Sequence, residues 1–259
     1  MDAVYKWPTW VIVAVIAAAT LIANIVSYHI TKRRRDNESD RAYGVSSSLK
    51  GGILGLVALL IGFTYSLTSS RFDERQHIVL NEANAIGTCY LRAGLLTELP
   101  RERIRAALRR YTDARLSLFD RGLEPGEAQR LSREMDAELD VIWSGVSIST
   151  ESDLERTRTS AIVPAANDVI DLSATRAWAS RNFLPPPVIF LLGVCMVVSG
   201  AITGHSFGQV HRPAAGLWAL QNVLMALVLF VILDFDRPRR GLITVDHQPL
   251  VDVRAAMRQ

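Results

Sequence analysis

Histidine and cysteine side chains are the groups of this sequence that could hold a metal ion or act as nucleophiles. The chain has 259 residues, including two cysteines and five histidines. The histidines are His29, His77, His205, His211 and His247. Their spacing is not that of a metal-binding motif, and there is no glycine-rich phosphate loop after a strand and no nucleophile elbow. The sequence therefore predicts a protein that is not an enzyme and has no metal site and no cofactor.

A second group of reactive side chains lies near the end of the chain, in the string DFDRPRRGLI of residues 234–243. It holds two acids and three arginines, and it follows directly after an almost purely apolar run. Arginines in such a place can reach lipid phosphates. The proline stops a helix, and the glycine lets the chain turn. Composition alone therefore predicts a helix leaving a membrane, with membrane lipid as the contact.

The apolar residues of the chain are concentrated in four stretches. These are residues 8–30, 49–70, 187–208 and 214–233. About 20 residues in a helix, each rising about 1.5 Å, cross the hydrocarbon core of a membrane. The first stretch ends in the basic run from Lys32 to Arg35 rather than in a small-residue cleavage site, so we interpret it as a retained anchor.

The four stretches predict an all-α polytopic membrane protein with four transmembrane helices. Between the second and third, apolar residues such as Val79, Ala83 and Ile86 recur at helical spacing, which indicates a helical extramembrane section. We expect four parts: the first transmembrane helix pair in 1–70, the extramembrane section in 71–186, the second pair in 187–235 and a juxtamembrane tail in 236–259.

Basic residues do not decide the orientation in the membrane. Six lysines and arginines lie in residues 32–50, and five arginines follow residue 236, which four spans place on the opposite side. There is no basic stripe with interleaved aromatic residues, so nucleic acid is not an expected partner.

Two rows of residues recur at helical spacing in the second span, one of small residues and one of large apolar residues. Gly51, Gly55 and Gly62 belong to a small-residue stripe, which in membranes lets helices approach closely. Gly200 and Gly204 repeat this pattern in the third span. The large apolar residues Leu59, Phe63 and Leu67 are spaced by four, and around a central axis they would form a constriction that gates by dewetting. Helix packing alone is the simpler interpretation of both rows.

Two blocks of the sequence carry a family resemblance. GFTYSLTSSRFDERQHIVLNEANAIGTCYLRAGLL and LDFDRPRRGLITVDHQPL resemble a family of bacterial membrane proteins of unknown function that is described as bestrophin-like. The resemblance runs from the second span to Leu250. It implies a multi-pass protein of the bacterial plasma membrane.

The further likeness to bestrophins themselves implies a function. Bestrophins are pentameric anion channels with four spans, a helical section between the second and third spans, and an apolar neck on the second helix. By analogy we expect a homo-oligomeric, anion-permeable channel with the second span lining the pore, and small inorganic ions as its cargo. The alternative is a non-conducting scaffold or sensor whose helical section binds a partner. Of the acidic calcium cluster of animal bestrophins only Asp234 and Asp236 remain, so a calcium site is not expected.

The resemblance also suggests that DFDRPRRGLI is more than a helix exit. We predict a juxtamembrane latch in which this string pairs with residues near the end of the second span, since four spans place both on one side of the membrane. The residues of this predicted latch are Arg71, Arg75, Glu82, Asp234, Asp236, Arg237, Arg239 and Arg240.

Overall fold

The computed structural model describes residues 7–34, 40–119, 125–150, 156–209, 215–237 and 241–258. Within these ranges the regular structure is helical, and no strand occurs. Contacts divide the chain into two compact units. We call residues 1–71 and 183–243 the membrane unit, and residues 72–182 and 244–259 the extramembrane unit.

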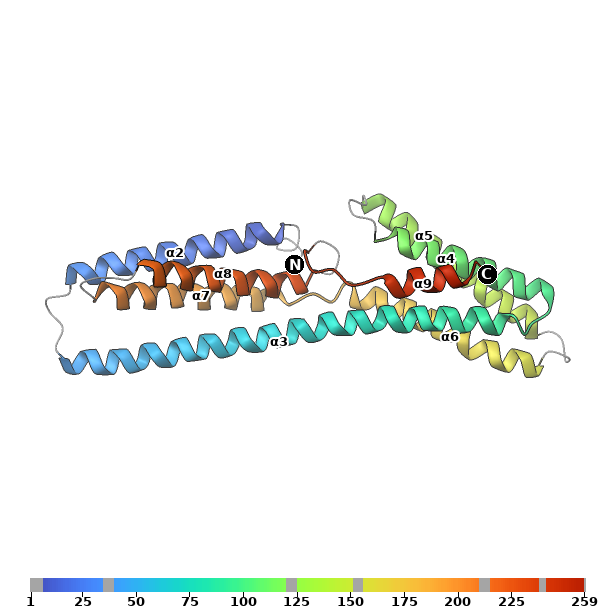
Figure 1. Ribbon diagram of the computed structural model, residues 1–259, viewed down its shortest axis with the longest axis horizontal. Helices are drawn as coiled ribbons and strands as arrows, with labels where there is room; N and C mark the ends of the chain where they lie inside the picture. The colour runs from blue at the N-terminus through green and yellow to red at the C-terminus, as the bar shows by residue number, and fades with distance from the viewer. Residues whose placement is uncertain are drawn as a thin grey trace. The chain divides into compact units, whose positions relative to one another are not determined.

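Four helices of the structure are long and apolar enough to cross a membrane, which confirms the predicted four-span, all-α fold. They are α2 (Thr9–Arg34), α3 (Asp40–Ala93), α7 (Pro186–Gly208) and α8 (Ala215–Phe235). Pro186 and Pro187 occupy the first turn of α7, where the missing N–H groups have no intrahelical partner to lose. Within the membrane unit α2 packs beside α7 and α8 (Figure 1).

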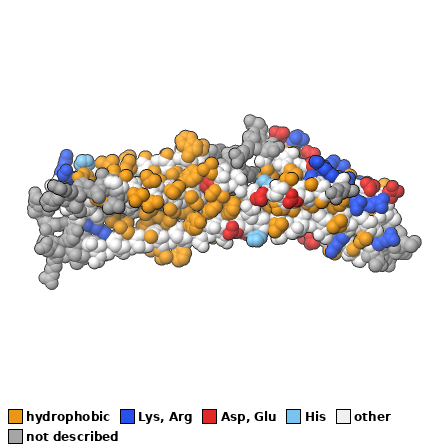
Figure 2. Space-filling view, viewed as in Figure 1, with side chains coloured by type: hydrophobic (Ala, Val, Ile, Leu, Met, Phe, Trp, Pro, Cys, Tyr) orange, Lys and Arg blue, Asp and Glu red, His pale blue; other side chains and the backbone are white. Residues whose placement is uncertain are grey.

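Apolar side chains cover most of the membrane unit on the face drawn in Figure 2, and the charged side chains in view lie mainly on the extramembrane unit. The membrane unit has its own buried cluster, formed by Leu184, Ile189, Leu192, Met196, Leu229, Ile232 and Leu233. These residues come from α7, from α8 and from the segment just before α7.

The extramembrane unit contains the second part of α3 together with α4 (Glu98–Ser117), α5 (Pro125–Thr150), α6 (Arg156–Ala179) and α9 (Gln248–Ala256). Helix α4 packs against α5 and α9, and α5 packs against α6 (Figure 1). Its core includes the fully buried residues Ile86, Ile104, Leu108, Tyr111, Ile142, Ile162 and Leu250. Each such aliphatic side chain contributes about 1.5–3 kcal/mol through removal of apolar surface from water.

The C-terminal residues are shared between the units. Residues 241–243 belong to the membrane unit, whereas the chain from Thr244 onward, with α9, belongs to the extramembrane unit. Tyr90 and Arg109 both donate hydrogen bonds to the carbonyl of Met257, each at 3.0 Å. The last residues of the chain are therefore fixed to α3 and α4.

Candidate functional site

The residues of the predicted constriction lie on an exposed face of α3. Leu59, Phe63 and Leu67 are all exposed, and Phe63 is 64 % exposed. Because they are spaced by four, they share one side of the helix. A different side of this span is packed, since Val57, Thr64 and Thr68 are buried. The membrane unit therefore presents a row of large apolar side chains that the chain itself does not bury.

The predicted packing glycines fall into two groups with different surroundings. A Cβ atom added to Gly51, Gly55 or Gly62 of α3 would meet no described atom within 4 Å. A Cβ atom added to Gly200 of α7 would lie 2.6 Å from the carbonyl oxygen of Thr20, and one added to Gly204 would lie 2.0 Å from that of Asn24. The α7 glycines thus permit close backbone contact with α2, while the α3 glycines lie on open surface.

Several polar side chains of the spans are hydrogen-bonded between or within helices. Thr31 Oγ1 of α2 and His205 Nδ1 of α7 are 2.7 Å apart. Gln221 of α8 donates to Thr203 Oγ1 of α7 at 2.9 Å. Since an unpaired polar group is costly in lipid, these bonds fix the helix neighbours. These hydrogen bonds explain why Thr31, His205 and Gln221 occur in apolar spans. None of the three side chains needs a role in conduction to be explained.

The two acids at the end of α8 bind main-chain N–H groups. Both carboxylate oxygens of Asp236 accept from Leu184 N, at 3.0 and 2.9 Å. Those of Asp234 accept from Leu242 N at 3.1 Å and Ile243 N at 2.8 Å. Both acids are only 1 % exposed. Charge-assisted bonds of this kind are the stronger ones in proteins, so the two acids fix the chain just before the third span and just after the last one.

The hydrogen bonds that Asp234 accepts from the main chain also require a glycine at position 241. A Cβ atom at this position would lie 2.7 Å from Asp234 Oδ1. The glycine therefore lets the main chain approach the carboxylate closely, so that the next two N–H groups can reach it.

Two arginines of the predicted latch, Arg75 and Arg237, have main-chain partners. Arg237 is buried and donates to the carbonyl of Trp7. Arg75 is buried and donates to the carbonyls of Asn182 at 2.9 Å and Ala179 at 3.4 Å. Arg71 is half-buried. Arg239 and Arg240 lie outside the described residues.

The two segments of the predicted latch belong mostly to different units. Arg75 and Glu82 lie in the extramembrane unit, and Asp234, Asp236 and Arg237 lie in the membrane unit. Pairing between the two segments therefore stays a prediction. The contacts described above each lie within a single unit.

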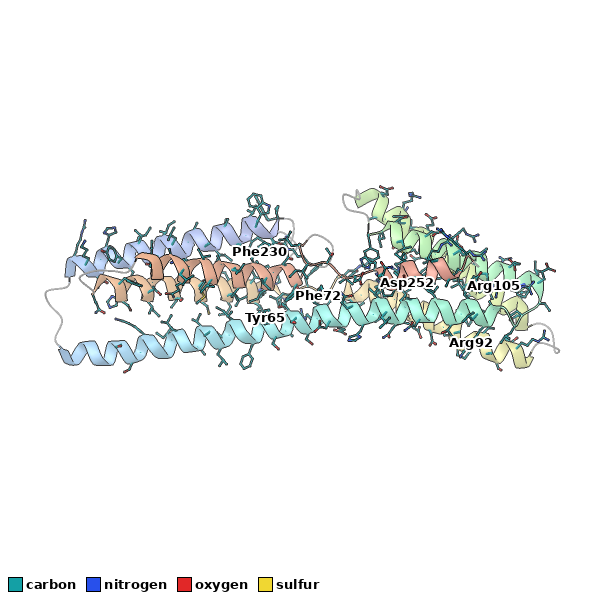
Figure 3. The ribbon with its side chains drawn as sticks, viewed as in Figure 1. Tyr65, Phe72, Arg92, Arg105, Phe230 and Asp252 are labelled. Atoms are coloured by element: carbon teal, nitrogen blue, oxygen red, sulfur yellow. The ribbon has the colours of Figure 1, made fainter. Side chains whose placement is uncertain are left out.

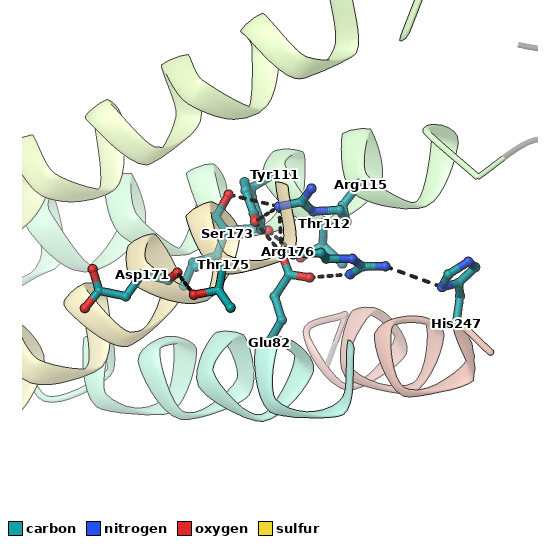
Figure 4. A network of polar contacts seen from close by, with 10 residues as sticks. Glu82, Tyr111, Thr112, Arg115, Asp171, Ser173, Thr175, Arg176 and His247 are labelled. Carbon is teal, nitrogen blue, oxygen red and sulfur yellow. Dashed lines mark hydrogen bonds and ion pairs between the residues drawn. The ribbon is translucent and has the colours of Figure 1, made fainter. Parts of the chain in front are cut away.

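Glu82 is the centre of a buried polar network in the extramembrane unit (Figure 4). Its side chain is fully buried. One carboxylate oxygen lies 2.8 Å from Arg115 Nη2 of α4, and the other pairs with Arg176 Nη1 of α6. Tyr111 donates to the same carboxylate at 2.5 Å. Glu82 therefore connects α3 to both α4 and α6.

The network extends beyond the carboxylate to two further side chains. Arg115 Nη2 donates to Ser173 Oγ at 2.9 Å. Arg176 Nη2 donates to His247 Nδ1 at 3.4 Å, and the imidazole of His247 stacks on the ring of Phe119. A residue just before α9 thereby joins the cluster.

The charges of this network do not balance, because two guanidinium groups share one carboxylate. Burial lowers the pKa of Arg176, and Glu82 only partly offsets this effect. Burial also opposes the charge of Arg115, but Glu82 and Tyr111 together raise the pKa of that guanidinium. Burial, with the negative charge of Glu82, raises the pKa of the Tyr111 phenol. The carboxylate is thus the group on which the charged state of both arginines depends.

Sequence reasoning placed Glu82 in the latch and missed Tyr111, Arg115 and Arg176 as its partners. A signal for burial was present, since Glu82 is three residues from Val79 and four from Ile86 in an apolar row of α3. An acid inside such a row predicts a buried charge that needs a partner. Arg92, which is labelled in Figure 3, binds the main chain instead. It donates to Ala161 O at 2.9 Å.

These features define a multi-pass, all-helical membrane protein with a helical unit inserted between its second and third spans. The family model of the Bestrophin-like domain matches residues 14–250. The chain belongs to this bestrophin-like family.

Solved structures of similar fold include several forms of a bacterial bestrophin homologue from Klebsiella pneumoniae. One substituted form has 13 % identity and a TM-score of 0.68, covering 94 % of this chain and 99 % of its own. A second substituted form has 14 % identity and a TM-score of 0.67, covering 96 % and 97 %. A further structure of that homologue has 14 % identity and a TM-score of 0.63, covering 95 % and 94 %. Such identities show a shared fold. No curated protein matches the chain.

Among the residues that the structure describes, no group of three histidine, cysteine, aspartate or glutamate side chains is placed to hold a metal ion. Asp234 and Asp236 bind main-chain N–H groups instead.

Proposed function

We propose that the chain assembles with copies of itself into an ion channel of the bacterial plasma membrane, with α3 lining the pore. The observation that carries this proposal is the open face of α3. It bears Leu59, Phe63 and Leu67 beside glycines at which an added Cβ atom would meet no described atom within 4 Å. Membership of the bestrophin-like family supports it further.

The open face has two functions in this proposal. The glycines let α3 of one subunit approach a neighbouring subunit closely. The row from Leu59 to Leu67 then faces the central axis and forms an apolar constriction, where a hydrated ion passes only when the neck is wide enough to stay wet. Conduction is passive and involves no covalent chemistry. A pentamer is the assembly expected by analogy with bestrophins.

The permeant ion of the proposed channel could be an anion or a cation. Anion permeability follows from the likeness to bestrophins. Cation permeability is favoured by the charges on α3: between residues 47 and 91, which the structure describes throughout, the exposed charged side chains are Asp73 and Glu74, both acidic. Rings of carboxylates attract cations. Reversal potentials in a KCl gradient decide between the two, and with cation selectivity Asp73→Asn and Glu74→Gln should move the potential toward zero.

A non-conducting scaffold or sensor is the second candidate function. Trp143 and Trp178 of the extramembrane unit are both exposed, and Trp178 is 64 % exposed. Exposed tryptophan is enriched where proteins bind one another, which favours a partner for this unit.

The number of subunits separates the channel from the scaffold. The channel proposal requires a ring of at least four copies with α3 innermost, which native mass measurements and cross-linking of single cysteines introduced at Phe63 would detect. A monomer or a dimer without an axial path contradicts the channel and leaves the scaffold.

A further inference from the structure

The segment from Thr244 to Arg258, which we call the C-terminal strap, is held to the extramembrane unit at two places. Its distal part is the second half of α9, from Asp252, with Met257. There Arg254 forms a two-pronged ion pair with Asp113 of α4, at 2.6 and 2.7 Å. Its proximal part contains Val245, His247 and Leu250, of which Val245 and Leu250 are buried.

The distal attachment does not change its charge near neutral pH. Hydrogen bonding to Asp113 raises the pKa of Arg254, so this guanidinium stays charged. The other distal bonds go to the carbonyl of Met257, which does not titrate. Acidification within the physiological range therefore leaves the distal attachment in place.

The proximal attachment depends on a neutral imidazole. Arg176 Nη2 lies 3.4 Å from His247 Nδ1. A guanidinium can only donate hydrogen bonds, so Nδ1 must carry a lone pair and His247 must be neutral when this bond is made. The ring also stacks on Phe119, with 3.6 Å between ring centroids and 29° between planes.

Charged groups around His247 come from three helices and from the strap itself. Arg176 of α6 contacts the ring directly. Glu82 of α3 lies on the far side of Arg176 and is shared with Arg115 of α4, so that one carboxylate faces two guanidinium groups. Asp246 of the strap is exposed and accepts a hydrogen bond from Gln248 N at 2.9 Å. A proton on His247 thus adds a positive charge beside a cluster that already carries an excess of one.

We propose that the strap is a pH-sensitive clasp in which protonation of His247 releases the proximal segment, residues 244–251, which includes the first turn of α9, while the rest of α9 stays docked. Protonation removes the acceptor for Arg176 and places two cations in contact. Histidine is the side chain that ordinarily gains a proton between pH 8 and 5. The clasp does not depend on ion conduction, because its contacts all lie within the extramembrane unit.

Hydrogen–deuterium exchange on the full chain in detergent tests the clasp. After correction for the intrinsic pH dependence of exchange, the amides of Leu250 and Val251, which donate to His247 O at 3.0 and 3.3 Å, should lose protection by about tenfold between pH 7.5 and 5.5. Peptides from α4 should keep their protection. Equal protection of the strap at both pH values overturns the proposal.

Two substitutions at residue 247 and a matched control complete the test. His247→Asn keeps an oxygen acceptor for Arg176 but cannot gain a proton in this range, so its strap should stay protected at pH 5.5. If this variant is already unprotected at pH 7.5, His247→Phe, which retains the stacking on Phe119, takes its place. His77→Asn, at an exposed position of α3, should respond to pH as the unsubstituted chain does. A loss of protection on acidification in His247→Asn or His247→Phe as large as in the unsubstituted chain contradicts the proposal.

Discussion

Glu82 of α3 and Arg115 of α4 form a buried ion pair, with 2.8 Å between Oε1 and Nη2. Arg176 binds the other oxygen of the same carboxylate. Breaking a buried ion pair by removing one partner is far more costly than replacing both, because the remaining charge is left without compensation. If the Glu82 carboxylate is removed, the charges left without compensation are the guanidinium groups of Arg115 and Arg176.

Glu82→Gln should therefore destabilise the protein by about 3–5 kcal/mol. Chemical unfolding followed through the extramembrane helices measures the loss. Glu138→Gln is the matched control, because Glu138 binds Arg110 in a pair whose arginine is half exposed, and it should cost no more than about 1 kcal/mol. Equal losses for the two variants would contradict the role of Glu82.

Asp236→Ala should destabilise the membrane unit by about 1–3 kcal/mol, because it leaves the buried N–H of Leu184 without its acceptor. Thermal unfolding in detergent measures the change. Asp236→Asn retains one oxygen acceptor and should lose less. Asp252→Ala, at an exposed position of α9 (Figure 3), is the control and should be close to neutral. If the Asp236→Ala protein is as stable as the unsubstituted chain, the string DFDRPRRGLI has no role beyond ending the helix.

Gly204→Ala should destabilise the packing of α7 on α2 by about 1–3 kcal/mol, because the new methyl group would lie 2.0 Å from the main-chain oxygen of Asn24. Gly55→Ala should leave the fold of the single chain intact and instead weaken assembly. Thermal midpoints and subunit number, measured on both variants, separate the two effects. Loss of folding in Gly55→Ala with normal assembly in Gly204→Ala would reverse this assignment.

These glycines show what the sequence could and could not predict. Small residues at three- and four-residue spacing predicted helix-facing stripes in both spans. The spacing does not say which helix covers a stripe, since that depends on contacts with distant residues, such as Gly204 with Asn24. The number and position of the spans were predictable, because twenty apolar residues in a row are a property of the local sequence.

Glu82 was harder to interpret for the same reason. Local spacing placed it beside Arg71 and Arg75, whereas its ion-pair partner Arg176 is 94 positions away. Helical periodicity identifies the face of α3 on which Glu82 lies, and only the packing of α4 and α6 on that face identifies its partners.

Tyr111 gives a prediction at alkaline pH. Burial, with the charge of Glu82, raises the pKa of its phenol well above the unfolded value of about 10. A raised pKa stabilises the folded state below pH 10, and this contribution is lost as the pH rises through the folded-state value. Absorbance of the phenolate should therefore show tyrosine that is still protonated at pH 11, and Tyr111→Phe should lower that resistant fraction. An unchanged resistant fraction in Tyr111→Phe would contradict the assignment.

Ion flux through liposomes is the most direct test of the central claim, that the open face of α3 lines a pore. Phe63→Ala should increase the flux of the permeant ion about tenfold, because it widens and wets the apolar constriction. Phe190→Ala removes the same side chain from another exposed position, on α7, and should leave the flux unchanged. Flux indistinguishable from that of empty liposomes, in both the unsubstituted chain and Phe63→Ala, would contradict the channel.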